Sequence, residues 1–220
     1  KNSNENLSGT KMYITLEPCN HYGRTPPCTK EIIKNRISEV IYSIEDIDNR
    51  VKGKSFKILR SKNIKVKIGL LKRDVNIFYK PYIFNRKHKI PYVTGKIAVS
   101  KNNLFYSKGT KRITDMYTDK LTHFLRYKND SLLISSKTLN KDNPKLNCRL
   151  KGLNHFSPKR IILDSKLETR TNSYIFKTAN KNNTIIFYKN NDRLKIAKFK
   201  KKGVQLIRFN KFKNGVFNIN

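Results

Sequence analysis

The chain has 220 residues, and its 49 Lys and Arg against 15 Asp and Glu give a formal net charge of +34. Hydrophobic residues make up 37%, and with 24 Ile, 12 Phe and 11 Tyr they exclude an intrinsically disordered chain. No window of about 18 apolar residues occurs, which argues against a membrane-spanning helix and a membrane partner. Three cysteines cannot all pair within the chain, so we expect a reducing, cytoplasmic location rather than a disulfide scaffold.

The positive charge has two interpretations. Lys and Arg can neutralise nucleic-acid phosphates. However, the chain has 36 Lys and 13 Arg, spread among 26 Asn, whereas base recognition and bidentate phosphate contact favour Arg. We therefore attribute the charge to a Lys-, Asn- and Ile-rich composition rather than to a dedicated nucleic-acid partner. The charge would still attract phosphorylated small molecules.

The first part of the chain alternates strand and helix signals. The predicted order is strand Lys11–Leu16, helix 29–35, strand Glu39–Ile44, helix 54–62, strand 64–69 and helix 71–85. This order predicts a parallel sheet covered by helices.

A polar stretch at residues 85–90 separates the two parts, so we divide the chain into domains 1–86 and 87–220. The second part is also expected to be α/β. Its predicted strands are residues 92–99, Ser131–Ser135, Lys159–Leu163, Thr184–Tyr188 and 204–209, and its predicted helix is residues 115–126, capped by Thr114.

The loop LEPCNHYGRTPPC, residues 16–28, places eight residues between Cys19 and Cys28. Cys28 is predicted to begin a helix, where unpaired N–H groups favour the thiolate that zinc binds. Pro residues in the loop restrict its backbone and so pre-set the two sulfurs. If both bind one tetrahedral ion, the sulfurs should lie about 3.5–4 Å apart. Two sulfurs alone do not complete a zinc site, so a pair of structural cysteines or a redox pair stays open.

The complete string TLEPC followed by H-x-G-R-T-P-P-C resembles the pyrimidine deaminase of riboflavin biosynthesis, one of the cytidine-deaminase-like zinc enzymes. The resemblance implies a partial three-layer α/β/α domain in which Cys19 and Cys28 bind zinc. It also implies that His21 contacts substrate rather than the metal. The family adds a His ligand and a catalytic Glu from an upstream His-x-Glu motif, which this chain lacks. We expect truncation rather than a degenerate, inactive deaminase.

Three later segments resemble the reductase domain that is fused to this deaminase. They are PYVTGKIAVS (residues 91–100), TLNKDNPKLNCR (138–149) and KRIILDS (159–165). The resemblance implies a partial dihydrofolate-reductase-like α/β domain that uses NADPH. It implies cofactor contacts at Ala98, Arg112, Thr138, Asp142 and Ser165, and substrate contacts at Thr110, Arg126, Leu146 and Arg149. Since Thr138 and Ser165 each follow a predicted buried strand, we expect Thr138, Asp142, Arg149 and Ser165 to line one cleft beside the strand that carries Ala98.

Together the resemblances imply a piece, truncated at both ends, of a bifunctional riboflavin-biosynthesis enzyme, for which a homo-oligomer is one of the expected states. Its reactions would be zinc-dependent deamination of a diaminohydroxypyrimidine ribosyl phosphate and NADPH-dependent reduction of the ribose to ribityl. Without the His-x-Glu motif, we expect this chain alone to lack deaminase activity. One alternative is a tRNA or nucleoside zinc deaminase, which usually has a tighter Pro-Cys-x-x-Cys and no reductase signature. Another is a basic nucleic-acid-binding protein with a structural zinc, which would need clustered phosphate-contacting and stacking residues.

Overall fold

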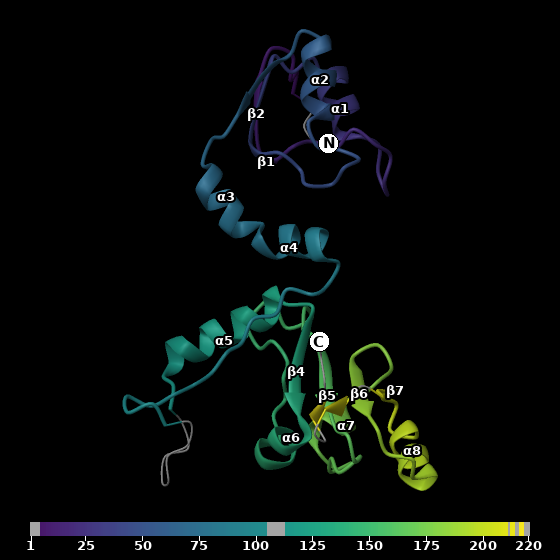
Figure 1. Ribbon diagram of the computed structural model, residues 1–220. Coiled ribbons are helices and arrows are strands. Elements are labelled where there is room, and N and C mark those ends of the chain that lie inside the picture. Colours follow the sequence, from purple (N-terminus) through teal and green to yellow (C-terminus); the bar gives the residue numbers. More distant parts are fainter. Residues whose placement is uncertain (1–4, 105–112, 211, 214–215, 218–220) are drawn as a thin grey trace. The chain divides into compact units, whose positions relative to one another are not determined.

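A computed structural model describes residues 5–104, 113–210, 212–213 and 216–217. The chain forms two compact units, Lys1–Lys96 and Ile97–Asn220 (Figure 1). Each unit contains a parallel sheet with helices packed on it, so the predicted α/β fold class is confirmed. In the part of the chain that is described, no helix is both long enough and apolar enough to cross a membrane.

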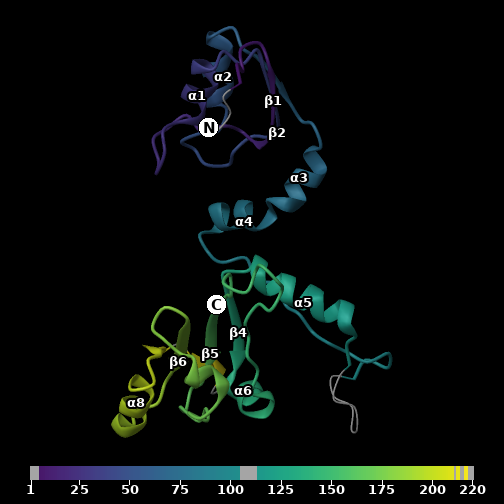
Figure 2. The same ribbon diagram turned by 180° about the vertical axis from the view of Figure 1, so that it is seen from behind.

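The first unit has a three-stranded sheet in the order β1 (Lys11–Leu16), β2 (Glu39–Ile44) and β3 (Lys65–Ile68). Both neighbouring pairs are parallel, as the order of sequence elements predicted. Helices α1 (Cys28–Lys34) and α2 (Lys54–Ser61) lie on one face of the sheet (Figures 1 and 2). Val40 and Tyr42 point to this face because side chains two apart share one side of a strand, and they pack with Ile32 and Leu59 of the helices.

The helix expected over residues 71–85 is two helices, α3 (Lys72–Phe78) and α4 (Lys80–His88), which meet at Tyr79. Pro81 in the first turn of α4 explains the break. Proline has no backbone N–H, and its ring would clash with the carbonyl of Ile77 in a continuous helix. The single-helix prediction was therefore wrong.

The second unit has a four-stranded parallel sheet in the order β4 (Ser131–Ser135), β5 (Lys159–Leu163), β6 (Thr184–Tyr188) and β7 (Gln205–Arg208). Its described helices are α5 (Met116–Lys128), α6 (Ser136–Asp142), α7 (Tyr174–Lys177) and α8 (Arg193–Lys200). The short strands β8 (Phe212–Lys213) and β9 (Val216–Phe217) pair antiparallel. Ile162 and Ile186 form the centre of its core, and α6, α7 and α8 add Leu139, Ile175 and Phe199.

Two sequence predictions for the second unit were wrong. Residues 92–99 form no strand: Val93 is 84% exposed and Ile97 is 68% exposed. A strand needs a hydrogen-bonded neighbour, and β propensity alone does not supply one. The cap of α5 is Asp115 rather than Thr114, because the Asp115 carboxylate accepts the N–H of Thr118 at 2.8 Å.

Candidate active-site residues in the two units

The two cysteines of the first unit lie side by side. Cys19 follows β1, Cys28 begins α1, and their sulfurs are 3.3 Å apart with no disulfide between them. The N–H of Cys28 donates to the sulfur of Cys19 at 3.2 Å, and the N–H of Thr29 donates to the carbonyl of Cys19 at 3.1 Å. The two sulfurs therefore lie close together, at a separation slightly below the range of about 3.5–4 Å that two ligands of one tetrahedral ion would have, and their role as zinc ligands stays a prediction.

A buried carboxylate, Glu17, shapes the backbone just before this pair. Glu17 is 3% exposed and accepts the N–H groups of Asp46 (3.2 Å), Gly53 (3.0 Å) and Ser55 (3.1 Å). The Ser55 hydroxyl donates to the carbonyl of Pro18 at 2.5 Å. The segment between β2 and α2 is thus bound to the residues that carry the cysteine motif. Glu17 was not predicted from the sequence, although a carboxylate directly after a strand and before Pro-Cys was a visible signal.

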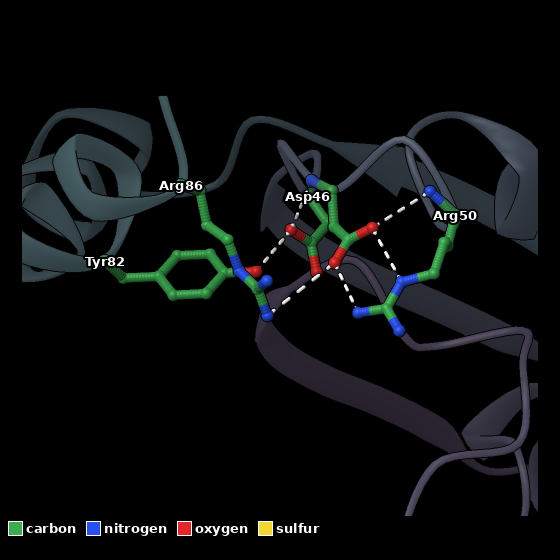
Figure 3. Close-up of polar contacts among 5 residues, drawn as sticks. Asp46, Arg50, Tyr82 and Arg86 are labelled. Atoms are coloured by element: carbon green, nitrogen blue, oxygen red, sulfur yellow. Dashed lines mark hydrogen bonds and ion pairs between the residues drawn. The ribbon is translucent and has the colours of Figure 1, made fainter. Parts of the chain in front are cut away.

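Helix α4 contacts the same segment through a polar cluster (Figure 3). The Tyr82 hydroxyl donates to Asp46 at 2.8 Å. Arg50 donates to both carboxylate oxygens of Asp48, at 2.9 and 2.6 Å, and Arg86 of α4 lies 3.7 Å from Asp48. The hydrogen bonds from Arg50 hold the pKa of Asp48 well below its usual value. Helix α4, the segment after β2 and the cysteine motif therefore form one connected network.

Two further polar atoms near the cysteine motif have no partner. The side-chain oxygen of Asn20 and Nδ1 of His21 are buried without a hydrogen bond. Across the described residues, no third His, Cys, Asp or Glu joins Cys19 and Cys28 in a group that could hold a metal ion. The pair thus offers two ligands, and His21 is not a third.

Three of the expected cofactor residues follow two neighbouring strands of the second unit. Thr138 and Asp142 lie on α6, directly after β4, and Ser165 follows β5. Because Ser135 pairs with Leu163, the carboxyl ends of these strands meet at one edge of the sheet. Crevices at such edges are where α/β proteins bind nucleotides. The Ser135 hydroxyl also accepts the N–H of Thr138 at 3.2 Å and so caps α6.

Asp164, which was not predicted from the sequence to have a role, fixes the loop that carries Ser165. It is 1% exposed and accepts the N–H groups of Glu168 and Thr169, both at 2.9 Å, and the Thr169 hydroxyl at 2.6 Å. The carbonyl of Ser165 accepts the N–H of Lys189 at 3.0 Å. These bonds define the backbone at the carboxyl end of β5.

The expected substrate residues Arg126, Leu146 and Arg149 gather around Asn147. Arg126 donates to the carbonyl of Asn147 and Arg149 donates to its side-chain oxygen, both at 3.1 Å. Leu146 is buried, and its φ of 55° places the backbone in the left-handed region. Nε of Arg126 is buried without a hydrogen bond, and burial together with the charge of Arg149 lowers the pKa of Arg126.

This pair of guanidinium groups has the character of an anion site. Over the residues that are described, neither Arg126 nor Arg149 forms an ion pair with a carboxylate. The charge of Asp119 partly offsets that of Arg126, yet Arg149 still repels Arg126, and a phosphate accepting from both guanidinium groups would reduce that repulsion.

The other expected residues have different outcomes. Ala98 lies in the irregular segment at 91–100, so it is not on a strand. Thr110 and Arg112 lie outside the described residues. The single cleft expected for Thr138, Asp142, Arg149 and Ser165 stays a prediction.

Known proteins resemble this chain over most of its length. A family profile described as the RibD C-terminal domain matches residues 91–216. The riboflavin biosynthesis protein RibD of Aquifex aeolicus is 34% identical over 208 residues, which are 92% of this chain and 57% of that protein. The protein of the same name from Bacillus amyloliquefaciens is 36% identical over 161 residues, 72% of this chain and 43% of that protein.

Solved structures give the same result. Acinetobacter baumannii RibD superimposes with a TM-score of 0.79 at 25% identity, covering 94% of this chain and 58% of that chain. The Thermotoga maritima diaminohydroxyphosphoribosylaminopyrimidine deaminase/5-amino-6-(5-phosphoribosylamino)uracil reductase gives 0.75 at 28% identity, covering 93% of this chain and 63% of that chain. The chain thus spans less than two thirds of the length of these relatives. It belongs to the RibD family, and the C-terminal domain of that family accounts for nearly all of its second unit.

Proposed function

We propose that the second unit is part of an NADPH-dependent reductase of riboflavin biosynthesis, acting on the ribose of a phosphorylated aminopyrimidine. The observation that carries the proposal is the pair formed by Arg126 and Arg149 around Asn147, inside the region that matches the RibD C-terminal domain. The Thermotoga maritima relative is named as a deaminase and reductase, which supports the substrate class.

The roles of the residues follow from their chemistry. Arg126 and Arg149 bind the substrate phosphate through charged hydrogen bonds, and Leu146 contacts the substrate through its backbone or by packing. Thr138, Asp142 and Ser165 hold NADPH at the carboxyl ends of β4 and β5, where polar groups of this kind fit a nucleotide. When bound, NADPH supplies the hydride that reduces the ribose carbon.

The first unit we assign to the zinc deaminase of the same family, in a cytidine-deaminase-like fold. Two sulfurs 3.3 Å apart need only a small increase in separation to take two positions of a tetrahedral zinc site. When bound, zinc would supply Lewis-acid chemistry and lower the pKa of water. Asn20 and His21, whose buried polar atoms have no partner, suit contacts to the pyrimidine. Since the chain has no His-x-Glu motif, it should release no ammonia from the diaminopyrimidine by itself.

A binding experiment tests the reductase assignment. Arg149→Ala should weaken binding of ribose 5-phosphate by roughly 10- to 150-fold, the value of about 1.5–3 kcal/mol for a charged hydrogen bond. Arg193→Ala removes the same charge from an exposed position on α8 and should leave the dissociation constant unchanged, as should Lys201→Ala. Equal weakening by all three variants would mean that the ligand responds only to net charge, and the assignment would fail.

A metal titration tests the deaminase assignment. Co²⁺ added to the chain should give the absorption of thiolate coordination, and Zn²⁺ should displace it. Cys19→Ser should abolish this signal. Cys148→Ser, which changes a buried thiol in the second unit, should leave it intact. A signal that survives Cys19→Ser would contradict the proposed ligand pair.

A further inference from the structure

His123 lies beside the Arg126–Arg149 pair and has no role in the function proposed above. It is half-buried on α5, and its Nδ1 accepts the N–H of Arg149 at 3.1 Å. Its backbone carbonyl accepts the thiol of Cys148 at 3.5 Å. Burial first, and then the charges of Arg149 and Arg126, lower the pKa of His123, which favours the uncharged imidazole. An uncharged ring is what an Nδ1 acceptor requires.

The histidine is one of several attachments between α5 and residues 147–149. Asn147 is held through its carbonyl by Arg126, Cys148 through its thiol by His123, and Arg149 through its N–H by His123. The N–H of Cys148 also donates to the Ser157 hydroxyl at 3.0 Å. Three consecutive residues therefore have fixed backbones, and the one that carries the second guanidinium group is fixed by an imidazole.

The local charges explain why an acceptor without charge is suited to this place. Arg126 and Asp119 on α5, and Arg149 and Cys148 on the facing segment, are the ionisable groups that act on His123 or its neighbours. A lysine or a protonated imidazole here would add a third positive charge and could not accept the N–H of Arg149. A carboxylate would accept it, but would pair with the guanidinium groups and compete with an anionic ligand.

We propose that His123 is a positioning residue for phosphate recognition: its uncharged imidazole holds the backbone of Arg149 so that Arg126 and Arg149 bind the same phosphate group. This inference rests on the proposed reductase function, because it takes the ligand of the pair to be the substrate phosphate. His123 acts through Arg149 and does not touch the ligand itself.

A double-mutant cycle with ribose 5-phosphate as the probe tests the inference. His123→Leu removes the acceptor and keeps a similar volume, and it should raise the dissociation constant about tenfold, as loss of one well-placed charged contact does. In the Arg149→Ala background the same change should add less than about twofold, because the contact it positions is already gone. His123→Asn, whose side-chain oxygen can replace Nδ1, should bind within about twofold of the unchanged chain.

Controls separate positioning from general destabilisation. His155→Leu makes the same chemical change at an exposed position of the second unit and should leave the dissociation constant unchanged. Where His123→Leu does not fold, by circular dichroism, His123→Phe takes its place in the cycle. Additive effects of the two mutations, or a tenfold loss in folded His123→Asn, would overturn the inference. If Arg149→Ala itself has no effect, the proposed function fails; if only His123→Leu has none, the inference alone fails.

Discussion

At the scale of single residues, a buried carboxylate of the first unit accepts hydrogen bonds from backbone N–H groups. Glu17 accepts three N–H groups from a segment 29 to 38 residues away in the chain. A buried N–H without an acceptor costs about 1–3 kcal/mol. Other conformations of this segment that lose the three hydrogen bonds are therefore disfavoured. This carboxylate holds together the residues that precede the cysteine pair and those that precede α2.

Replacing Glu17 should therefore destabilise the first unit. Glu17→Gln keeps the volume but turns one acceptor into a donor that faces an N–H, so we expect a loss of about 2–3 kcal/mol in the free energy of unfolding. Urea denaturation followed by hydrogen exchange in β2 measures it. Glu45→Gln makes the same change at an exposed site and should be neutral; an equal effect would show that charge rather than backbone bonding matters.

Asp48 gives the first unit a pH dependence. Its pKa is lowered in the folded state, mainly by the hydrogen bonds from Arg50, so the folded state binds fewer protons than the unfolded state near the ordinary Asp pKa of about 3.9. The resulting stability is present above that pH and is lost as pH falls further.

Arg50→Ala should remove much of this dependence. Between pH 5 and pH 2, the variant should lose less stability than the unchanged chain, measured as the shift of the urea midpoint of the first unit. Arg60→Ala, an exposed change on α2, is the comparison and should keep the full acid loss. If Arg50→Ala loses as much stability between pH 5 and pH 2 as the unchanged chain does, carboxylates other than Asp48 cause the loss.

At the scale of elements, backbone conformation sets where helices end. After α8 the chain turns at Gly203, whose φ is 74°, and a Cβ there would lie 3.2 Å from the carbonyl oxygen of Ala179. Gly152 has a similar φ of 79°, but nothing lies within 4 Å of its added Cβ. Alanine at Gly152 would therefore meet only the cost of a left-handed backbone, whereas alanine at Gly203 would also meet a steric contact.

We expect both Gly→Ala changes to destabilise the second unit, and Gly203→Ala by more. Gly152→Ala should cost about 1 kcal/mol from the left-handed backbone alone, and Gly203→Ala roughly 1 kcal/mol more, because the carbonyl must also move. Thermal unfolding of the two variants compares them. Equal losses would mean that the segment at Ala179 moves away without resistance.

The elements found from sequence were those whose pattern is local. β2 and β5 are runs of apolar residues. The cysteine loop is restricted by its own prolines, so the closeness of its two sulfurs could be predicted from the sequence. Residues 92–99 carry a strand pattern but lack a strand beside them, and α6 begins directly at the end of β4 without a turn signal. Glu17, Asp164 and His123 were missed because burial and distant partners, not local pattern, define their roles.

At the scale of the whole molecule, we expect the charge of +34 to act without a dedicated nucleic-acid site. Polyanions should bind through counterion release, which is sensitive to salt and indifferent to sequence. Two unrelated single-stranded RNAs should bind equally at low salt, and their affinities should fall together by at least about 100-fold between 0.05 and 0.5 M NaCl. Fluorescence anisotropy measures both. A preference for one RNA that persists at the higher salt would support a true nucleic-acid surface instead.

The strand order in both sheets has a consequence for how the protein is made. In each unit the strands lie side by side in the order in which they occur along the chain, β1-β2-β3 and β4-β5-β6-β7. Every new strand can therefore add to the growing edge of its sheet without waiting for a later one to be inserted between its neighbours. A nascent chain leaving the ribosome from its amino end can build each sheet strand by strand, and the first unit can complete its described core before the second is synthesised.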